Sequence, residues 1–255
     1  MSALVLVYAG LAGLAIGSFL NVCVYRLPAG LSVVTPRSRC PQCERPIRWY
    51  ENIPVASYIA LRGRCRGCGE RISLQYPLVE LATGIIWVAM AARFGPTLAA
   101  LSGAVFLTLL LGIALTDARE YIIPDEFSLG GLLLGLAFAA FPGGMPFLRA
   151  VAGAAVGFAS LYLVAIVGQW VFRKEAMGGG DIKMMAMVGA FVGPAGALLT
   201  IFLGALLGTL IFGPISIITK RLVPFGIFLA LGAAVTHGWG EDLIRWYLGL
   251  VFGGG

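Results

Sequence analysis

The sequence predicts an all-α polytopic integral membrane protein of about eight transmembrane helices, with a small cytosolic loop domain like a zinc ribbon between the first two. Three observations support this fold class. Of the 255 residues, 59% are hydrophobic and 12% are charged, whereas a soluble domain carries about 25% charged residues. Long apolar segments recur along the chain, and four of its five cysteines lie in one polar stretch between the first two.

The apolar segments are the expected transmembrane helices. A helix needs about 20 apolar residues to cross a bilayer, and the fourth and sixth segments are shorter than the others. The segments cover residues 3–25, 74–93, 97–116, 127–141, 148–172, 183–194, 196–219 and 224–238. Residues 241–252, which are partly charged, either extend the last helix or lie in the membrane interface.

Glycines spaced four residues apart predict close packing between these helices, because small side chains let two backbones approach each other in lipid. The pairs are Gly13/Gly17, Gly153/Gly157, Gly189/Gly193 and Gly204/Gly208. Asn21, inside the first segment, either hydrogen-bonds a neighbouring helix or lines a site.

Charge predicts the orientation and the domain boundaries. The stretch from Arg26 to Arg71 contains nine arginines and three glutamates, so we expect it on the cytosolic side. We expect three parts: a first transmembrane helix (1–25), a basic cytosolic domain (26–73) and a transmembrane catalytic domain (74–255). The N-terminus would lie outside, and no basic region marks the first helix as a cleaved signal peptide. Topology explains the net charge of +6, so we expect no nucleic-acid partner.

The basic loop contains two C-x-x-C pairs, which are typical of a zinc ribbon. Cys40 and Cys43 are followed after 21 residues by Cys65 and Cys68, and four thiolates at such spacing form a tetrahedral metal site. Disulfides are the alternative, but a cytosolic compartment is reducing. The fifth cysteine, Cys23, is expected to be a small buried side chain.

Four acids in or beside the apolar segments are candidate site residues. Intramembrane acids are costly and therefore suggest function. Glu80 lies one turn inside the second segment. Its role can be structural, substrate-contacting or catalytic. Asp117 closes the third segment, where the helix dipole disfavours a carboxylate. Asp125 follows the helix break at Pro124 and is expected to be an N-cap. Asp181 lies near the start of a segment.

Three glycines precede Asp181. Gly178, Gly179 and Gly180 are unsuited to a helix interior, so they suggest a broken backbone or the close approach of another chain, such as a substrate. Lys183 can stabilise a carboxylate or anchor the helix at the lipid head groups. If Asp117 and Asp181 converge, they can share one proton, so that one activates water while the other protonates a peptide carbonyl.

The ordered motifs resemble those of the type IV prepilin peptidases, also called prepilin leader peptidase/N-methyltransferases. The resemblance covers nearly the whole chain, and one small departure is Ile227, where the family often has proline. The motifs are Gly17-Ser18-Phe19-Leu20-Asn21-Val22 through Arg26-Leu27-Pro28, both C-x-x-C pairs, Tyr76-Pro77-Leu78-Val79-Glu80, Asp117 with Pro124-Asp125, Gly178-Gly179-Gly180-Asp181-Ile182-Lys183, and Pro224-Phe225-Gly226.

The resemblance implies an eight-span aspartic endopeptidase of the bacterial inner membrane, with Asp117 and Asp181 as its catalytic acids at the cytosolic face. Its substrates would be type IV prepilins and type II secretion pseudopilins, whose leader it removes. S-adenosylmethionine would serve a second, N-methylating activity, for which no glycine-rich cofactor loop is recognisable in the sequence. The alternatives are an ion- or proton-coupled transporter using Glu80, Asp117 and Asp181, a non-enzymatic assembly factor, and an archaeal preflagellin peptidase, which the four cysteines argue against.

Overall fold

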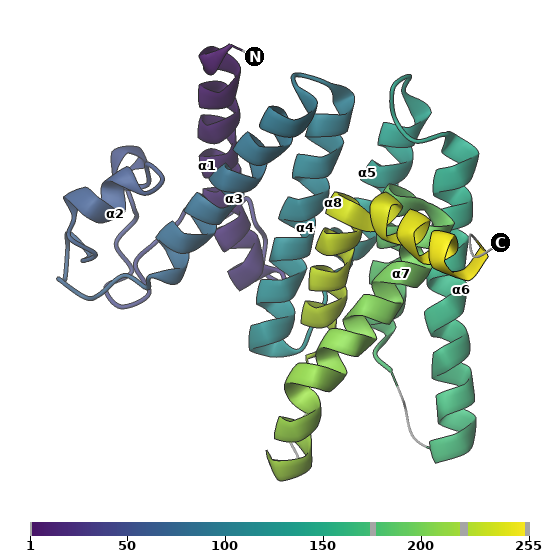
Figure 1. Ribbon diagram of the computed structural model, residues 1–255. Helices are drawn as coiled ribbons and strands as arrows, with labels where there is room; N and C mark the ends of the chain where they lie inside the picture. Colours follow the sequence, from purple (N-terminus) through teal and green to yellow (C-terminus); the bar gives the residue numbers. More distant parts are fainter. Residues whose placement is uncertain (1, 174–176, 220–223, 253–255) are drawn as a thin grey trace. The chain divides into compact units, whose positions relative to one another are not determined.

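The computed structural model describes residues 2–173, 177–219 and 224–252, and within them the chain is helical, without a strand (Figure 1). This confirms the all-α fold class. The elements are α1 (Ala3–Arg26), the 3-10 helix η1 (Trp49–Glu51), α2 (Ala56–Ala60), α3 (Gln75–Phe94), α4 (Leu98–Glu120), α5 (Asp125–Ala140), α6 (Phe147–Phe172), α7 (Gly179–Thr219) and α8 (Phe225–Phe252).

Five of the described helices are long and apolar enough to cross a membrane, so the chain is a multi-pass membrane protein. They are Ala3–Arg26, Gln75–Phe94, Leu98–Glu120, Phe147–Val171 and Gly179–Ile211. The predicted sixth and seventh segments share α7, and the backbone is not helical at Gly193 (φ 76°, ψ 179°), near the end of the predicted sixth segment. Helix α5 has only 16 residues, as its short apolar segment predicts. Helix α8 runs on to Phe252.

The chain forms two compact units, Met1–Thr108 and Leu109–Gly255. In the first unit α1 packs closely on α3. A Cβ at Gly13 would lie 2.9 Å from the Cα of Gly84, and one at Gly17 would lie 2.8 Å from the Cα of Glu80. The Asn21 side chain, 4% exposed, donates to the carbonyl of Tyr76 at 3.1 Å. Asn21 therefore makes the interhelical hydrogen bond that the sequence suggested.

In the second unit α7 packs against α5, α6 and α8. Residues 184–191 are all buried, as expected of a helix that is apolar on every side. Glycines bring α6 and α7 into backbone contact, because a Cβ at Gly153 would overlap the carbonyl oxygen of Gly189, and one at Gly157 would overlap that of Met185. The small-residue spacing thus predicted this contact correctly.

The turn between α4 and α5 confirms the predicted break at Pro124. Helix α4 ends at Glu120, and Tyr121 adopts a left-handed φ of 55°. The N-cap of α5 is Pro124, and Asp125 is its first helical residue. The prediction that Asp125 is the N-cap was therefore wrong by one residue. The extended backbone of Pro124 suits the cap position, and the Asp125 carboxylate binds another helix instead.

The packing of α6 on α7 predicts that a side chain at Gly189 destabilises the protein. In Gly189→Ala the new Cβ must push the backbone of Gly153 away, which we expect to lower the free energy of unfolding by about 1–3 kcal/mol. The thermal unfolding midpoint of the purified protein in detergent measures the effect. Gly130→Ala in α5 is the control, because nothing lies within 4 Å of its added Cβ. Equal midpoints for the two variants would contradict the prediction.

Candidate functional site

Asp117 is a buried carboxylate whose partner is a backbone amide of another helix. It lies in the last turn of α4 and is 6% exposed. Its Oδ2 atom accepts a hydrogen bond from the N–H of Ile227 at 3.1 Å, and the backbone of Gly226 adjoins the same oxygen. Both residues belong to the first turn of α8, where backbone N–H groups lack partners within the helix.

Asp181 lies in the first turn of α7 and is partly exposed. Ile123 lies near both acids: a Cβ at Gly180, the residue before Asp181, would lie 3.0 Å from the Cβ of Ile123, and a Cβ at Gly226 would lie 2.9 Å from both Cδ1 of Ile123 and Oδ2 of Asp117. The structure therefore brings together two acids that are far apart in the sequence. Two carboxylates that come within a few ångströms of each other cannot both ionise without a large cost, which is the property that an acid pair at this place would use.

The three glycines before Asp181 have different surroundings. A Cβ at Gly180 would lie 3.0 Å from the Cβ of Ile123, so the start of α7 sits tightly against the turn before α5. A Cβ at Gly178 would lie 3.5 Å from Oδ2 of Asp181, and nothing lies within 4 Å of one at Gly179. None of the three has the positive φ that would require glycine. Their small size leaves space beside Asp181 instead.

Lys183 binds Asp125, joining the start of α7 to the first turn of α5. Its Nζ donates to both carboxylate oxygens of Asp125, at 2.7 and 2.9 Å. Both side chains are exposed, and an exposed pair contributes about 0–1 kcal/mol. Of the two roles considered for Lys183, the structure shows carboxylate binding.

Glu80 lies in the first unit, in α3, and holds the basic loop. Its side chain is buried at 7% exposure, and its Oε2 atom accepts a hydrogen bond from the N–H of Val55 at 2.7 Å. Val55 has a positive φ of 60°, which is strained for a β-branched residue. Glu80 therefore has a structural partner that fixes the turn before α2.

The two C-x-x-C pairs form matching turns. The N–H of Cys40 donates to the backbone carbonyl of Arg45, and the N–H of Cys65 donates to the backbone carbonyl of Glu70. In each turn the residue four positions after the first cysteine has a positive φ: Glu44 at 53° and Gly69 at 73°. Isolated bridges close both turns, Arg39 to Pro46 and Arg64 to Arg71.

The four sulfur atoms of these turns can hold a metal ion. They all lie within 4.8 Å of one another, with Cys40 Sγ to Cys68 Sγ at 3.8 Å and Cys43 Sγ to Cys65 Sγ at 4.0 Å. Four sulfurs bound to zinc at about 2.3 Å stand about 3.8 Å apart, whereas a disulfide bond is about 2.05 Å long. The distances fit a tetrahedral site and exclude disulfides among these cysteines.

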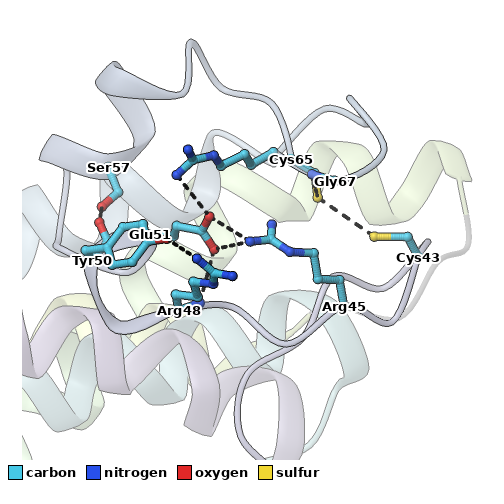
Figure 2. Close-up of polar contacts among 9 residues, drawn as sticks. Cys43, Arg45, Arg48, Tyr50, Glu51, Ser57, Cys65 and Gly67 are labelled. Carbon is cyan, nitrogen blue, oxygen red and sulfur yellow. Dashed lines mark hydrogen bonds and ion pairs between the residues drawn. The ribbon is translucent and has the colours of Figure 1, made fainter.

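Glu51 joins the two cysteine turns through arginines (Figure 2). Its side chain is 4% exposed and accepts hydrogen bonds from Arg45 at 2.9 and 3.0 Å and from the N–H of Arg48 at 3.1 Å. Arg66 stands between the cysteines of the second pair, and its Nη1 atom lies 3.7 Å from Oε1 of Glu51. The hydrogen bonds from Arg45 and Arg48 hold the pKa of the Glu51 carboxyl below its ordinary value of 4.5.

Sequence reasoning did not identify the roles of Glu51, Gly226 and Ile227. Glu51 looked like one of three acids in a basic loop, and nothing in the sequence pairs it with Arg45. Gly226 was noticed only as part of a motif. A glycine after Pro224, at the start of an apolar segment, is a signal for a close approach at a helix N-terminus.

Two family descriptions match the chain. Residues 11–94 match the bacterial peptidase A24 N-terminal domain, and residues 104–213 match the type IV leader peptidase family. No solved structure gives a significant match.

Several proteins called prepilin leader peptidase/N-methyltransferase are similar to the chain. The protein of Pseudomonas putida is 38% identical over 257 residues, covering 91% of this chain and 89% of that protein. The Neisseria gonorrhoeae protein is 34% identical over 256 residues, which cover 91% of this chain and 87% of that protein. The Myxococcus xanthus protein is 49% identical over 181 residues, and the aligned part spans 71% of this chain but only 54% of that protein.

The contacts of Glu51 predict that Glu51→Gln loosens the cysteine turns, because Arg45 then loses its ionic partner. Since the folded pKa of Glu51 lies below 4.5, its stabilisation is fully present above that pH and is lost as the pH falls through the folded value. We expect faster hydrogen exchange in residues 40–68 of the variant at neutral pH, and a smaller difference from the unmodified protein in acid. Glu44→Gln, at an exposed side chain, is the control and should exchange normally. A difference between Glu51→Gln and the unmodified protein that grows with acidity would contradict this role.

Proposed function

The chain belongs to the type IV leader peptidase family, as its motifs indicated, and we propose on this basis that it is a membrane aspartic endopeptidase. It removes the leader peptides of type IV prepilins and type II secretion pseudopilins and then N-methylates the new terminus. The observation that carries the peptidase proposal is that Asp117 and Asp181 lie in one unit and both near Ile123. The match to a bacterial N-terminal domain favours this reading over an archaeal preflagellin peptidase, and no finding favours a transporter or an assembly factor.

The two acids suffice for peptide hydrolysis without a covalent intermediate. The ionised carboxylate takes a proton from water as the oxygen attacks the peptide carbonyl carbon, and the neutral acid gives its proton to the carbonyl oxygen. The tetrahedral intermediate then collapses. The first acid returns its proton to the departing amine, and the second recovers one from the intermediate's hydroxyl group, so the pair ends in its starting state.

The neighbouring residues support the acid pair. The space left by Gly178 and Gly179 beside Asp181 accommodates an extended substrate backbone. Lys183 and Asp125 hold the first turn of α7 near the start of α5. Glu80 fixes the basic loop rather than reacting, which agrees with its hydrogen bond to Val55.

The metal of the basic loop is zinc in this proposal, held by Cys40, Cys43, Cys65 and Cys68. Its function is structural: a segment of this kind buries few apolar side chains, so metal binding supplies folding free energy. S-adenosylmethionine supplies the methyl group of the second activity. No glycine-rich loop follows a strand in the described residues, so no residue is assigned to that group.

The protein lies in the bacterial inner membrane with its N-terminus outside and Asp117 and Asp181 at the cytosolic face. The excess of arginines between α1 and α3 supports this orientation. A prepilin presents its leader on the same face, ahead of its hydrophobic helix. The acid pair would therefore meet the substrate from the cytosol.

The direct test is to incubate the purified protein with a prepilin, with and without S-adenosylmethionine, and to determine the product's N-terminus by mass spectrometry. We expect leader removal in both reactions and a methylated terminus only in the first. An unprocessed prepilin would refute the peptidase proposal. A cleaved, unmethylated product would refute only the second activity.

The acid pair predicts that Asp117→Asn and Asp181→Asn each abolish leader cleavage, because an amide can neither take the proton of water nor share one with its partner. Membrane insertion and the unfolding midpoint should stay normal. Cleavage is measured on the purified variants, with Asp242→Asn, at an exposed side chain of α8, as a control that retains activity. Activity in either site variant would remove that aspartate from the mechanism.

The sulfur cluster predicts that Cys65→Ser loses bound zinc, since three thiolates and a hydroxyl bind it far more weakly. Elemental analysis of the purified protein measures the metal. Cys23→Ala is the matched control, because Cys23 lies in α1, outside the cluster. Absence of zinc from the unmodified protein would defeat the assignment.

A further inference from the structure

The first turn of α8 gives Asp117 an environment that its own helix cannot. Asp117 lies at the C-terminal end of α4, where carbonyl groups disfavour negative charge. Helix α8 presents its N-terminal end to the carboxylate, and the amide of Ile227 donates to Oδ2 of Asp117 at 3.1 Å. A helix N-terminus that meets a buried carboxylate stabilises its charge in the same way as it binds other anions.

Gly226 makes this approach possible. A Cβ at Gly226 would lie 2.9 Å from Oδ2 of Asp117 and 2.9 Å from Cδ1 of Ile123, closer than real Cβ contacts come. The φ of Gly226 is not in the left-handed region, so the backbone conformation does not demand glycine. The close approach of Asp117 and Ile123 is what excludes a side chain here.

We propose that the first turn of α8 is the positioning element for Asp117, with Gly226 as a positioning residue whose missing side chain lets the carboxylate reach the Ile227 amide. This inference rests on the proposed peptidase function and deepens it. It also assigns the two acids different tasks. Backbone amides can only donate, so they favour the ionised form of Asp117, whereas Asp181 has no hydrogen-bond donor among the described residues.

The shared proton then resides on Asp181. Asp117 is the base that takes a proton from the attacking water, and Asp181 is the acid that protonates the carbonyl oxygen.

The test compares kcat and KM for prepilin cleavage by the purified full-length variants. Gly226→Ala should lower kcat about a hundredfold, as expected when a reacting group moves by about 1 Å, with KM and the unfolding midpoint little changed. Ile227→Pro removes one donor but keeps a backbone allowed in a first helical turn, and should lower kcat about tenfold. Gly249→Ala, in the same helix with nothing within 4 Å of its added Cβ, should behave as the unmodified protein.

A second comparison separates the two neighbours of Gly226. Ile123→Val removes the Cδ1 atom that the alanine would meet but leaves Asp117 in place. If Asp117 is the important neighbour, the double variant Gly226→Ala/Ile123→Val stays slow. Full recovery of kcat in the double variant would show that the glycine serves packing on Ile123 and would overturn the inference.

The outcomes also distinguish this inference from the proposed function. Normal kcat in Gly226→Ala, with an active unmodified protein and an inactive Asp117→Asn, overturns the positioning element alone. A Gly226→Ala protein that does not fold leaves the decision to Ile227→Pro, whose normal kcat would likewise overturn it. An unmodified protein that cleaves no prepilin overturns the proposed function and this inference together.

Discussion

A carboxylate buried among apolar helices must find hydrogen-bond donors, and this constraint organises the described structure. Asp117 meets it through the first turn of α8, more than a hundred residues further along the chain. Because the start of α7, which carries Asp181, packs on Ile123 near that carboxylate, the candidate site depends on α4, α7 and α8 together. In the first unit, Glu80 follows the same principle by binding the amide of Val55.

Glycine serves this architecture by allowing atoms to come closer than a side chain would permit. Between α6 and α7, Gly153 and Gly189 bring two backbones into contact, which fixes the helix that carries Asp181. At the start of α8, Gly226 brings a backbone to a carboxylate instead. In the first case the missing side chain stabilises the fold, and in the second it shapes the site.

The cysteine turns use a different solution because they have little apolar core. Four sulfurs at metal-binding distances join the two turns at one end, and the buried Glu51 carboxylate joins them through Arg45 and Arg66 at another. An ion pair with an almost fully buried carboxylate links the turns independently of a metal. Glu80, in α3, binds the backbone of Val55, the strained residue just before α2.

The sequence by itself determined the helical class, the break at Pro124, the close packing at paired glycines and the four-cysteine cluster, because each follows from local composition or spacing. Its ordered motifs also resembled those of the family to which the chain belongs. It also singled out Asp117 and Asp181 as a pair. Only the tertiary structure decided what surrounds them, since hydrogen bonds such as Asp117 to Ile227 join residues with no sequence relation. The same reason explains why Asp125 binds Lys183 instead of capping its helix, and why Glu51 holds two turns together.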